Sequence, residues 1–179
     1  MNTPVRKTVL LALLSSLLMT FAAMVWTPSV ALADDQPARQ AFDISQTVVR
    51  IPLAEGVSAD DAIDALRSRA VQYNMKLVAH QPLSQELAAR GIESGRLEIF
   101  QFCNPADAHR MVQHNPVFAA YMPCRIALVE DGDGQMWLMM IDLDMLIDNA
   151  ELPPELKTIA ERINSTLMAM MEAAAEGAF

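Results

Sequence analysis

The sequence lacks the short motifs by which many enzyme families are recognised. It contains no serine framed by glycines, no HExxH, no phosphate-binding loop and no GxGxxG fingerprint. These absences favour a protein without catalysis of its own, although catalytic groups can also be scattered along a chain.

Basic residues are also scarce. The 179-residue chain has 13 Lys and Arg against 22 Asp and Glu, which gives a formal net charge of −9. A surface this negative repels phosphate backbones and anionic lipids. The composition therefore argues against a nucleic-acid partner.

The first 33 residues have the pattern of a secretory signal peptide. Arg6 and Lys7 precede an uncharged apolar run from Val9 to Trp26, and Ala31-Leu32-Ala33 gives the small-x-small pattern of a cleavage site. Cleavage there leaves 11 basic and 22 acidic residues, a net charge of −11. The alternative is a retained anchor, because 18 apolar residues can just span a bilayer. We expect an exported, periplasmic or secreted protein without membrane contact after cleavage.

Beyond a polar leader at 34–44, predicted to be disordered, the pattern predicts one α+β domain. Ser58 and Asp61 form a capping box that begins an amphipathic helix, and Asp-Gly-Asp-Gly at 131–134 predicts a hairpin. The expected order is β-α-β-α-β-α-β-β-α, with a mixed sheet of about five strands and helices mainly on one face. We place the core domain at 45–150 and a C-terminal helix at 151–179. The expected strands are 45–53, 75–79, 96–103, 124–130 and 135–141, and the expected helices before the last one are 58–74, 82–89 and 106–113.

Two short stretches resemble the family catalogued as domain of unknown function 302. They are Phe-Cys-Asn-Pro at 102–105 and Met-Pro-Cys-Arg-Ile-Ala-Leu-Val-Glu at 122–130, followed by the glycine turn. The resemblance runs from about Val49 to Leu146, and the last helix lies beyond it. It implies a compact bacterial or archaeal α+β domain that pairs into homodimers, and it brings no established reaction. It also implies that a cysteine or glycine often stands at the position of Cys103.

The two cysteines, Cys103 and Cys124, are interpreted first as a structural disulfide, because exported cysteines usually pair. Their 21-residue separation closes a loop worth about 3 kcal/mol in the chain-entropy model. A redox-active pair and two free thiols stay open as alternatives. The cysteines do not form a CxxC motif, which argues against the redox interpretation.

A soft-metal site is the second interpretation of the same region. Cys103, Cys124, His114 and Met122 would suit copper or zinc. His109 and His114 are five residues apart, which separates them by more than a hundred degrees around a helix. No cofactor is therefore favoured, and copper or zinc stays an alternative.

The preferred hypothesis is a non-catalytic module that binds a small ligand or an exported partner protein. Its candidate binding residues are Asn104, Met122 and Arg125, at the sheet end beside the cysteines. A further alternative is a structural subunit that docks through the final helix, from Glu155 to Ala174.

Overall fold

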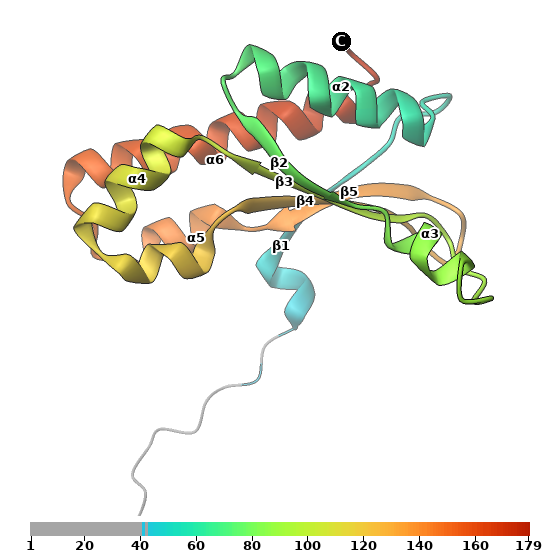
Figure 1. Cartoon of the computed structure of the whole chain (residues 1–179), viewed down its shortest axis with the longest axis horizontal. Coiled ribbons are helices and arrows are strands. Elements are labelled where there is room, and N and C mark those ends of the chain that lie inside the picture. The colour runs from blue at the N-terminus through green and yellow to red at the C-terminus, as the bar shows by residue number, and fades with distance from the viewer. Residues whose placement is uncertain (1–40, 42) are drawn as a thin grey trace, which may run out of the picture. The chain divides into compact units, whose positions relative to one another are not determined.

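A computed structural model describes Ala41 and residues 43–179; the predicted signal peptide and most of the predicted leader lie outside the described residues. Its elements follow the expected order, with two short 3-10 helices and one short α-helix in addition (Figure 1). In chain order they are η1 (Ile44–Thr47), β1 (Val48–Pro52), α2 (Ala59–Gln72), β2 (Lys76–Gln81), α3 (Leu83–Ala88), β3 (Leu97–Cys103), α4 (Pro105–His114), η2 (Pro116–Tyr121), β4 (Cys124–Glu130), β5 (Met136–Ile141), α5 (Leu143–Asp148) and α6 (Pro154–Ala175).

The five strands form one open sheet in the order β1-β5-β4-β3-β2. The predicted fold class and strand number are confirmed. The sheet is not mixed, however, because every neighbouring pair is antiparallel. Strands β2 to β5 lie side by side in chain order. Strand β1 pairs antiparallel with β5 and forms one edge of the sheet.

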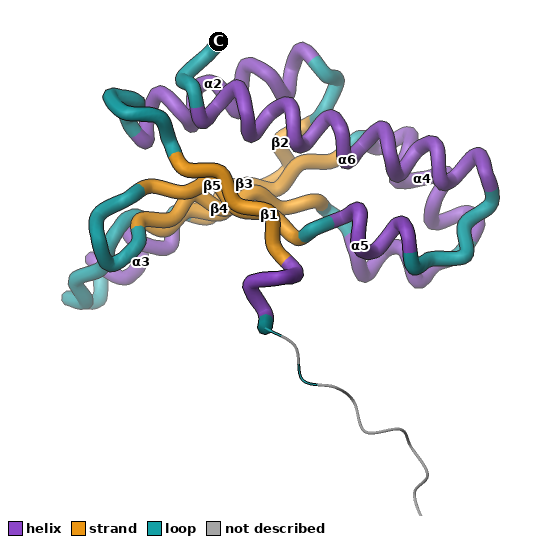
Figure 2. The backbone as a smooth tube through the Cα atoms, turned by 180° about the vertical axis from the view of Figure 1, so that it is seen from behind, coloured by secondary structure: helices purple, strands orange, loops and turns teal. Residues whose placement is uncertain are grey.

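Helices α2 and α6 lie side by side across one face of this sheet (Figures 1 and 2). The capping box of α2 is formed as predicted: the Ser58 side chain accepts from the Asp61 backbone N–H, and the Asp61 carboxylate accepts from the Ser58 backbone N–H. Helix α6 contributes Leu167, Met170 and Met171 to the core. These buried side chains make α6 part of the domain and leave that face of the helix unavailable for docking.

Alternate residues of the central strands fill the core beneath the two helices. Phe100, Phe102, Ile126, Leu128 and Leu138 have no exposed surface. Each is separated from the next on its strand by one residue that points to the other face, as the pleat requires.

One charged residue, Glu98, occupies this otherwise apolar row and is 1% exposed. His80 Nε2 lies 2.5 Å from its Oε2, and Arg96 Nε donates to its Oε1. Arg96 also donates to Asp60 on α2 at 2.8 Å, and the His80 ring stacks on Phe100 with centroids 4.4 Å apart. The carboxylate is therefore satisfied, and it links β2, β3 and α2.

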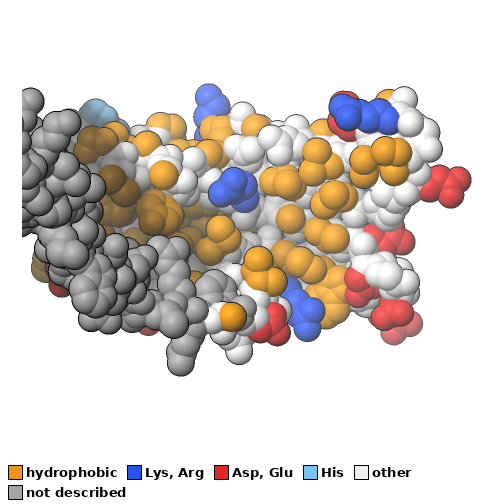
Figure 3. All heavy atoms as spheres, turned by 90° about the horizontal axis from the view of Figure 1, so that it is seen from below, with side chains coloured by type: hydrophobic (Ala, Val, Ile, Leu, Met, Phe, Trp, Pro, Cys, Tyr) orange, Lys and Arg blue, Asp and Glu red, His pale blue; other side chains and the backbone are white. Residues whose placement is uncertain are grey.

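The opposite face of the sheet carries half-buried apolar side chains interrupted by arginines (Figure 3). One row across this face consists of Ile99, Ala127 and Met139. The guanidinium carbon of Arg50 lies 4.9 Å from the centre of the Trp137 ring. Within the described residues, no helix is long and apolar enough to cross a bilayer.

Candidate functional site

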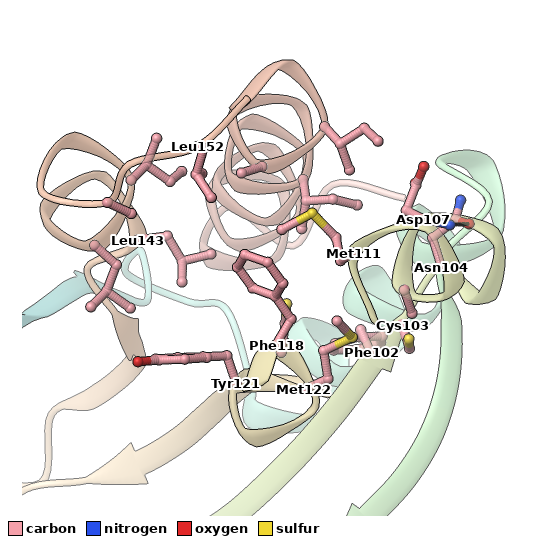
Figure 4. A pocket seen from close by; sticks show the side chains of 18 of the residues that line it. Phe102, Cys103, Asn104, Asp107, Met111, Phe118, Tyr121, Met122, Leu143 and Leu152 are labelled. Atoms are coloured by element: carbon pink, nitrogen blue, oxygen red, sulfur yellow. Dashed lines mark hydrogen bonds between the residues drawn. The ribbon is translucent and has the colours of Figure 1, made fainter. Parts of the chain in front are cut away.

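A pocket of about 340 Å³ opens at the end of the sheet where β3 ends and β4 begins (Figure 4). Helices α4 and η2 form one side of it, and α5, α6 and the segment between them form the other. Its volume lies at the lower end of the range of small-molecule sites. The pocket is therefore large enough to hold a small molecule.

The chain turns into the pocket at Asn104, the N-cap of α4. Its side chain accepts from the backbone N–H groups of Ala106 and Asp107, and it donates weakly to the Asn74 carbonyl at 3.4 Å. Pro105 then occupies the first turn of the helix, where its missing N–H costs nothing. Asn104 lines the pocket mainly as a cap that fixes the start of α4.

The walls are almost entirely apolar. Met111 on α4 and Phe118 on η2 face the interior in Figure 4, with Met122 below them and Leu143 and Leu152 opposite. Ile159 and Ile163 on α6 complete this lining. Such a surface favours apolar molecules, because their transfer from water is worth about 25 cal/mol per Å² buried.

The charged lining is sparse and of one sign. Asp107 and Glu151 are its carboxylate residues, and the lining contains no lysine, arginine or histidine. Asp107 is 8% exposed; its Oδ1 accepts from Arg162 at 2.8 Å, and its Oδ2 is buried without a hydrogen-bond partner. Because Arg162 balances the charge of Asp107, the remaining charge of the lining is the Glu151 carboxylate, which disfavours anionic molecules but not neutral or cationic ones.

The predicted disulfide is not present, because Cys103 and Cys124 are both free thiols. Cys124 pairs with Phe102 in the register of β3 and β4, so Cys103 is offset by one residue from the partner of Cys124. Adjacent residues of a strand direct their side chains to opposite faces, so this offset does not align the two Cβ atoms for a bond. Both cysteines nevertheless belong to the lining of the pocket.

Burial raises the pKa of both thiols. Desolvation, with the nearby Cys103 thiol, raises the pKa of Cys124 to about 11. The pKa of Cys103 is also raised, by desolvation and by the negative charge of Asp107. Both residues are therefore protonated at neutral pH, which argues against a low-pKa redox thiol.

The rate of alkylation should reveal the raised pKa of Cys124 directly. In Cys103→Ser, the remaining Cys124 should react with iodoacetamide about tenfold more slowly at pH 8 than a thiol of ordinary pKa, because its smaller thiolate fraction outweighs its greater nucleophilicity. The rate should still be rising at pH 10, because desolvation, the largest cause of the raised pKa of Cys124, persists when the Cys103 thiol is absent. A cysteine-containing peptide provides the reference rate. If the alkylation rate, measured by stopped flow or mass spectrometry, reached a plateau near pH 9, the pKa of Cys124 would not be raised.

The structure separates the three predicted ligand-binding residues. Asn104 and Met122 line the pocket, but Arg125 does not. Arg125 follows Cys124 on β4 and points to the other face of the sheet, where it borders a second hollow with Val48, Ile99 and Tyr121. The alternation of the strand therefore splits the expected cluster.

The predicted metal-ligand set is also only partly assembled. Cys103, Cys124 and Met122 reach the pocket, but His114 is exposed at the end of α4, with its ring centroid 6.4 Å from that of Phe118. Among the described residues, no group of three or more His, Cys, Asp or Glu side chains gathers in a metal-binding arrangement.

Sequence reasoning missed the far wall of the pocket. The elements expected from the sequence include no helix between 141 and 151, yet Leu143–Asp148 form α5, whose N-cap Asp142 accepts from the Met145 backbone N–H. The aspartate followed by Leu143, Leu146 and Ile147 at helical spacing is the signal that could have identified this helix.

Comparisons with known proteins support the fold and assign no activity. An uncharacterized protein of Aquifex aeolicus (strain VF5) is 28% identical over 93 residues, which are 52% of this chain and 59% of that protein. The chain thus spans about three fifths of the length of that relative. A crystal structure of an uncharacterized conserved protein DUF302 from Bacillus stearothermophilus superimposes with a TM-score of 0.60 at 22% identity, covering 72% of this chain and 98% of the other.

The family described as "Domain of unknown function DUF302" matches residues 49–174. This match extends beyond Leu146 through most of α6, further than the sequence resemblance indicated, in keeping with the place of α6 in the core. The chain belongs to the DUF302 family.

Proposed function

We propose that this domain binds a small apolar molecule, neutral or cationic, in the pocket at the end of β3 and β4. The observation that supports this most is the lining itself: about 340 Å³ of space among apolar side chains, with carboxylates as the charged residues. A binding role needs no activated nucleophile, and the raised pKa of Cys124 provides none.

The types of side chain in the walls favour a pocket that can adapt to ligands of different shapes. Met111 and Met122 are unbranched and flexible, and Phe118 and Tyr121 offer flat faces to a ligand. Thioether and aromatic surfaces together suit planar or aliphatic molecules of moderate size. The Glu151 carboxylate makes fatty-acid-like anions poor ligands.

Two related fluorescent probes test the charge preference. N-phenylnaphthylamine is neutral, and anilinonaphthalene sulfonate shares its rings but carries a permanent negative charge. We expect the neutral probe to bind at least about tenfold more tightly, a difference of about 1.4 kcal/mol. Equal binding of both probes, or none of the neutral one, would contradict the proposal.

Filling the pocket should abolish probe binding. Ala108 lines the pocket from α4, so Ala108→Leu places three additional carbons in the space that the probe needs. We expect the affinity for N-phenylnaphthylamine to fall by about tenfold or more, measured by fluorescence titration. Ala106→Leu is the matched control, because Ala106 lies on the same helix, is exposed and does not line the pocket. If the two variants bind the probe equally well, the site lies elsewhere.

Export and self-association are proposed on separate grounds. The signal-peptide pattern at 1–33 supports a periplasmic or secreted location, and the family resemblance supports a homodimer. Neither is required for the pocket, whose lining comes from a single chain.

A further inference from the structure

Sulfur atoms are concentrated in the pocket. Two thiols, Cys103 and Cys124, and three thioethers, Met75, Met111 and Met122, belong to its lining. The sequence singled out Met122 as a possible soft-metal ligand, and the fold brings it, with Met75 and Met111 from separate segments, to the same place as both cysteines. The juxtaposition is the observation that calls for an explanation.

The strand register accounts for the gathering. Strand β2 begins at Lys76, β3 ends at its partner Cys103, and β4 begins at Cys124, so the three neighbouring strands meet at one end of the sheet. Met75 immediately precedes β2, and Met122 stands two residues before Cys124. Four of the five sulfur-bearing residues therefore occupy adjoining strand ends, and Met111 faces the same space from α4 (Figure 4).

The surroundings select a cation that prefers sulfur. The pocket lining has no lysine, arginine or histidine to repel a cation; Asp107 is paired with Arg162, and Glu151 adds negative charge. The convergent ligands that zinc usually takes are not assembled among the described residues. Thiolate and thioether ligands suit Cu(I), which belongs with soft donors.

We propose that Cys103, Cys124 and Met122 form a binding site for Cu(I) at the adjoining ends of β3 and β4. This deepens the proposed function, because it names a soft metal ion as a ligand of the same pocket. A metal–sulfur bond of about 2.3 Å lets an ion bridge sulfur atoms roughly twice as far apart as the two atoms of a disulfide. Such an ion therefore does not require the direct alignment of two cysteines that a disulfide needs.

Binding requires no electron transfer. Each thiol gives up its proton as its sulfur donates an electron pair to the ion, so that two protons are released for one Cu(I) bound by both cysteines. The Met122 thioether donates a lone pair without losing a proton. The metal enters and stays as Cu(I), and no oxidant or reductant takes part in the step.

The test is an anaerobic competition for Cu(I) against the chromophoric chelator bicinchoninate, followed by absorbance. We expect the protein to withdraw one Cu(I) per chain. Cys124→Ser should lower the affinity by about a hundredfold and Met122→Leu by about tenfold, since changes even in the supporting shell of a metal site cost 10–100-fold. X-ray absorption of the loaded protein should show a first shell of sulfur.

Met139→Leu is the control, because Met139 lies on the opposite face of the sheet and outside the pocket. Its affinity for Cu(I) should equal that of the unchanged protein. No Cu(I) uptake, or uptake unaffected by both site variants, would overturn the metal site. Met122→Leu preserves the size and apolar character of the side chain, so its result stands even if Cys124→Ser fails to fold. Binding of N-phenylnaphthylamine by the metal-free protein reports separately on the proposed function, so either proposal can fail alone.

Discussion

Replacing Phe102 by alanine should lower the free energy of unfolding by about 3–5 kcal/mol. Phe102 has no exposed surface, and it lies between Leu77 and Cys124 on the neighbouring strands. Removing the ring deletes core contacts and leaves a cavity that adjoins the existing pocket. The measurement is urea unfolding followed by the fluorescence of Trp137, whose indole N–H donates to Asp131.

Two further variants serve as controls for the Phe102→Ala measurement. Phe102→Leu retains most of the buried volume and should cost about 1–2 kcal/mol, so the effect is measurable even if the alanine variant is mostly unfolded. Phe179→Ala removes a side chain that is 66% exposed and should change stability by less than about 0.5 kcal/mol. A loss below about 1 kcal/mol for Phe102→Ala would mean that this end of the sheet is loosely packed.

Replacing Glu98 by alanine should cost about 3 kcal/mol, because two hydrogen bonds to a buried carboxylate are lost together. His80 and Arg96 then lose their common acceptor. Their side chains are 27% and 34% exposed, so both regain some water, which keeps the loss below that of a fully buried pair. Chemical denaturation and hydrogen exchange along β2 and β3 would measure it.

Glu98→Gln is the matched control. It preserves the shape and one acceptor, so it should cost clearly less than Glu98→Ala. A double-mutant cycle with His80→Ala isolates the coupling between the two residues, which we expect at about 1 kcal/mol or more. If Glu98→Ala were neutral, the carboxylate would be present for a reason other than stability.

Local sequence signals predicted the elements well where short-range physics dominates. The Ser58–Asp61 capping box begins α2, the glycine turn at 131–134 joins β4 to β5, and Asn104-Pro105 separates β3 from α4. Each of these depends on hydrogen bonds or dihedral preferences within about four residues. The same reasoning missed α5, whose 6 residues give so short an apolar period that the Asp142 cap was needed to distinguish it from a connection.

The candidate site was only half predictable for a different reason. Asn104, Met122 and both cysteines were singled out from the sequence, and all four line the pocket. Arg125 was grouped with them because it adjoins Cys124 in the chain. Neighbouring residues of a strand face opposite sides of a sheet, so proximity in sequence placed it on the wrong face.

The sequence by itself determined the family, the α+β class, the order of the principal elements and the sulfur-rich region around residues 102–124. These depend on composition, local patterns and motifs that every short stretch carries on its own. Only the tertiary structure decided that the cysteines are offset by one residue, that the sheet is wholly antiparallel, and that α5 and α6 close an apolar pocket over the ends of β3 and β4. Register and packing join residues far apart in the chain, and their energies depend on all the partners at once, so no single stretch of sequence contains them.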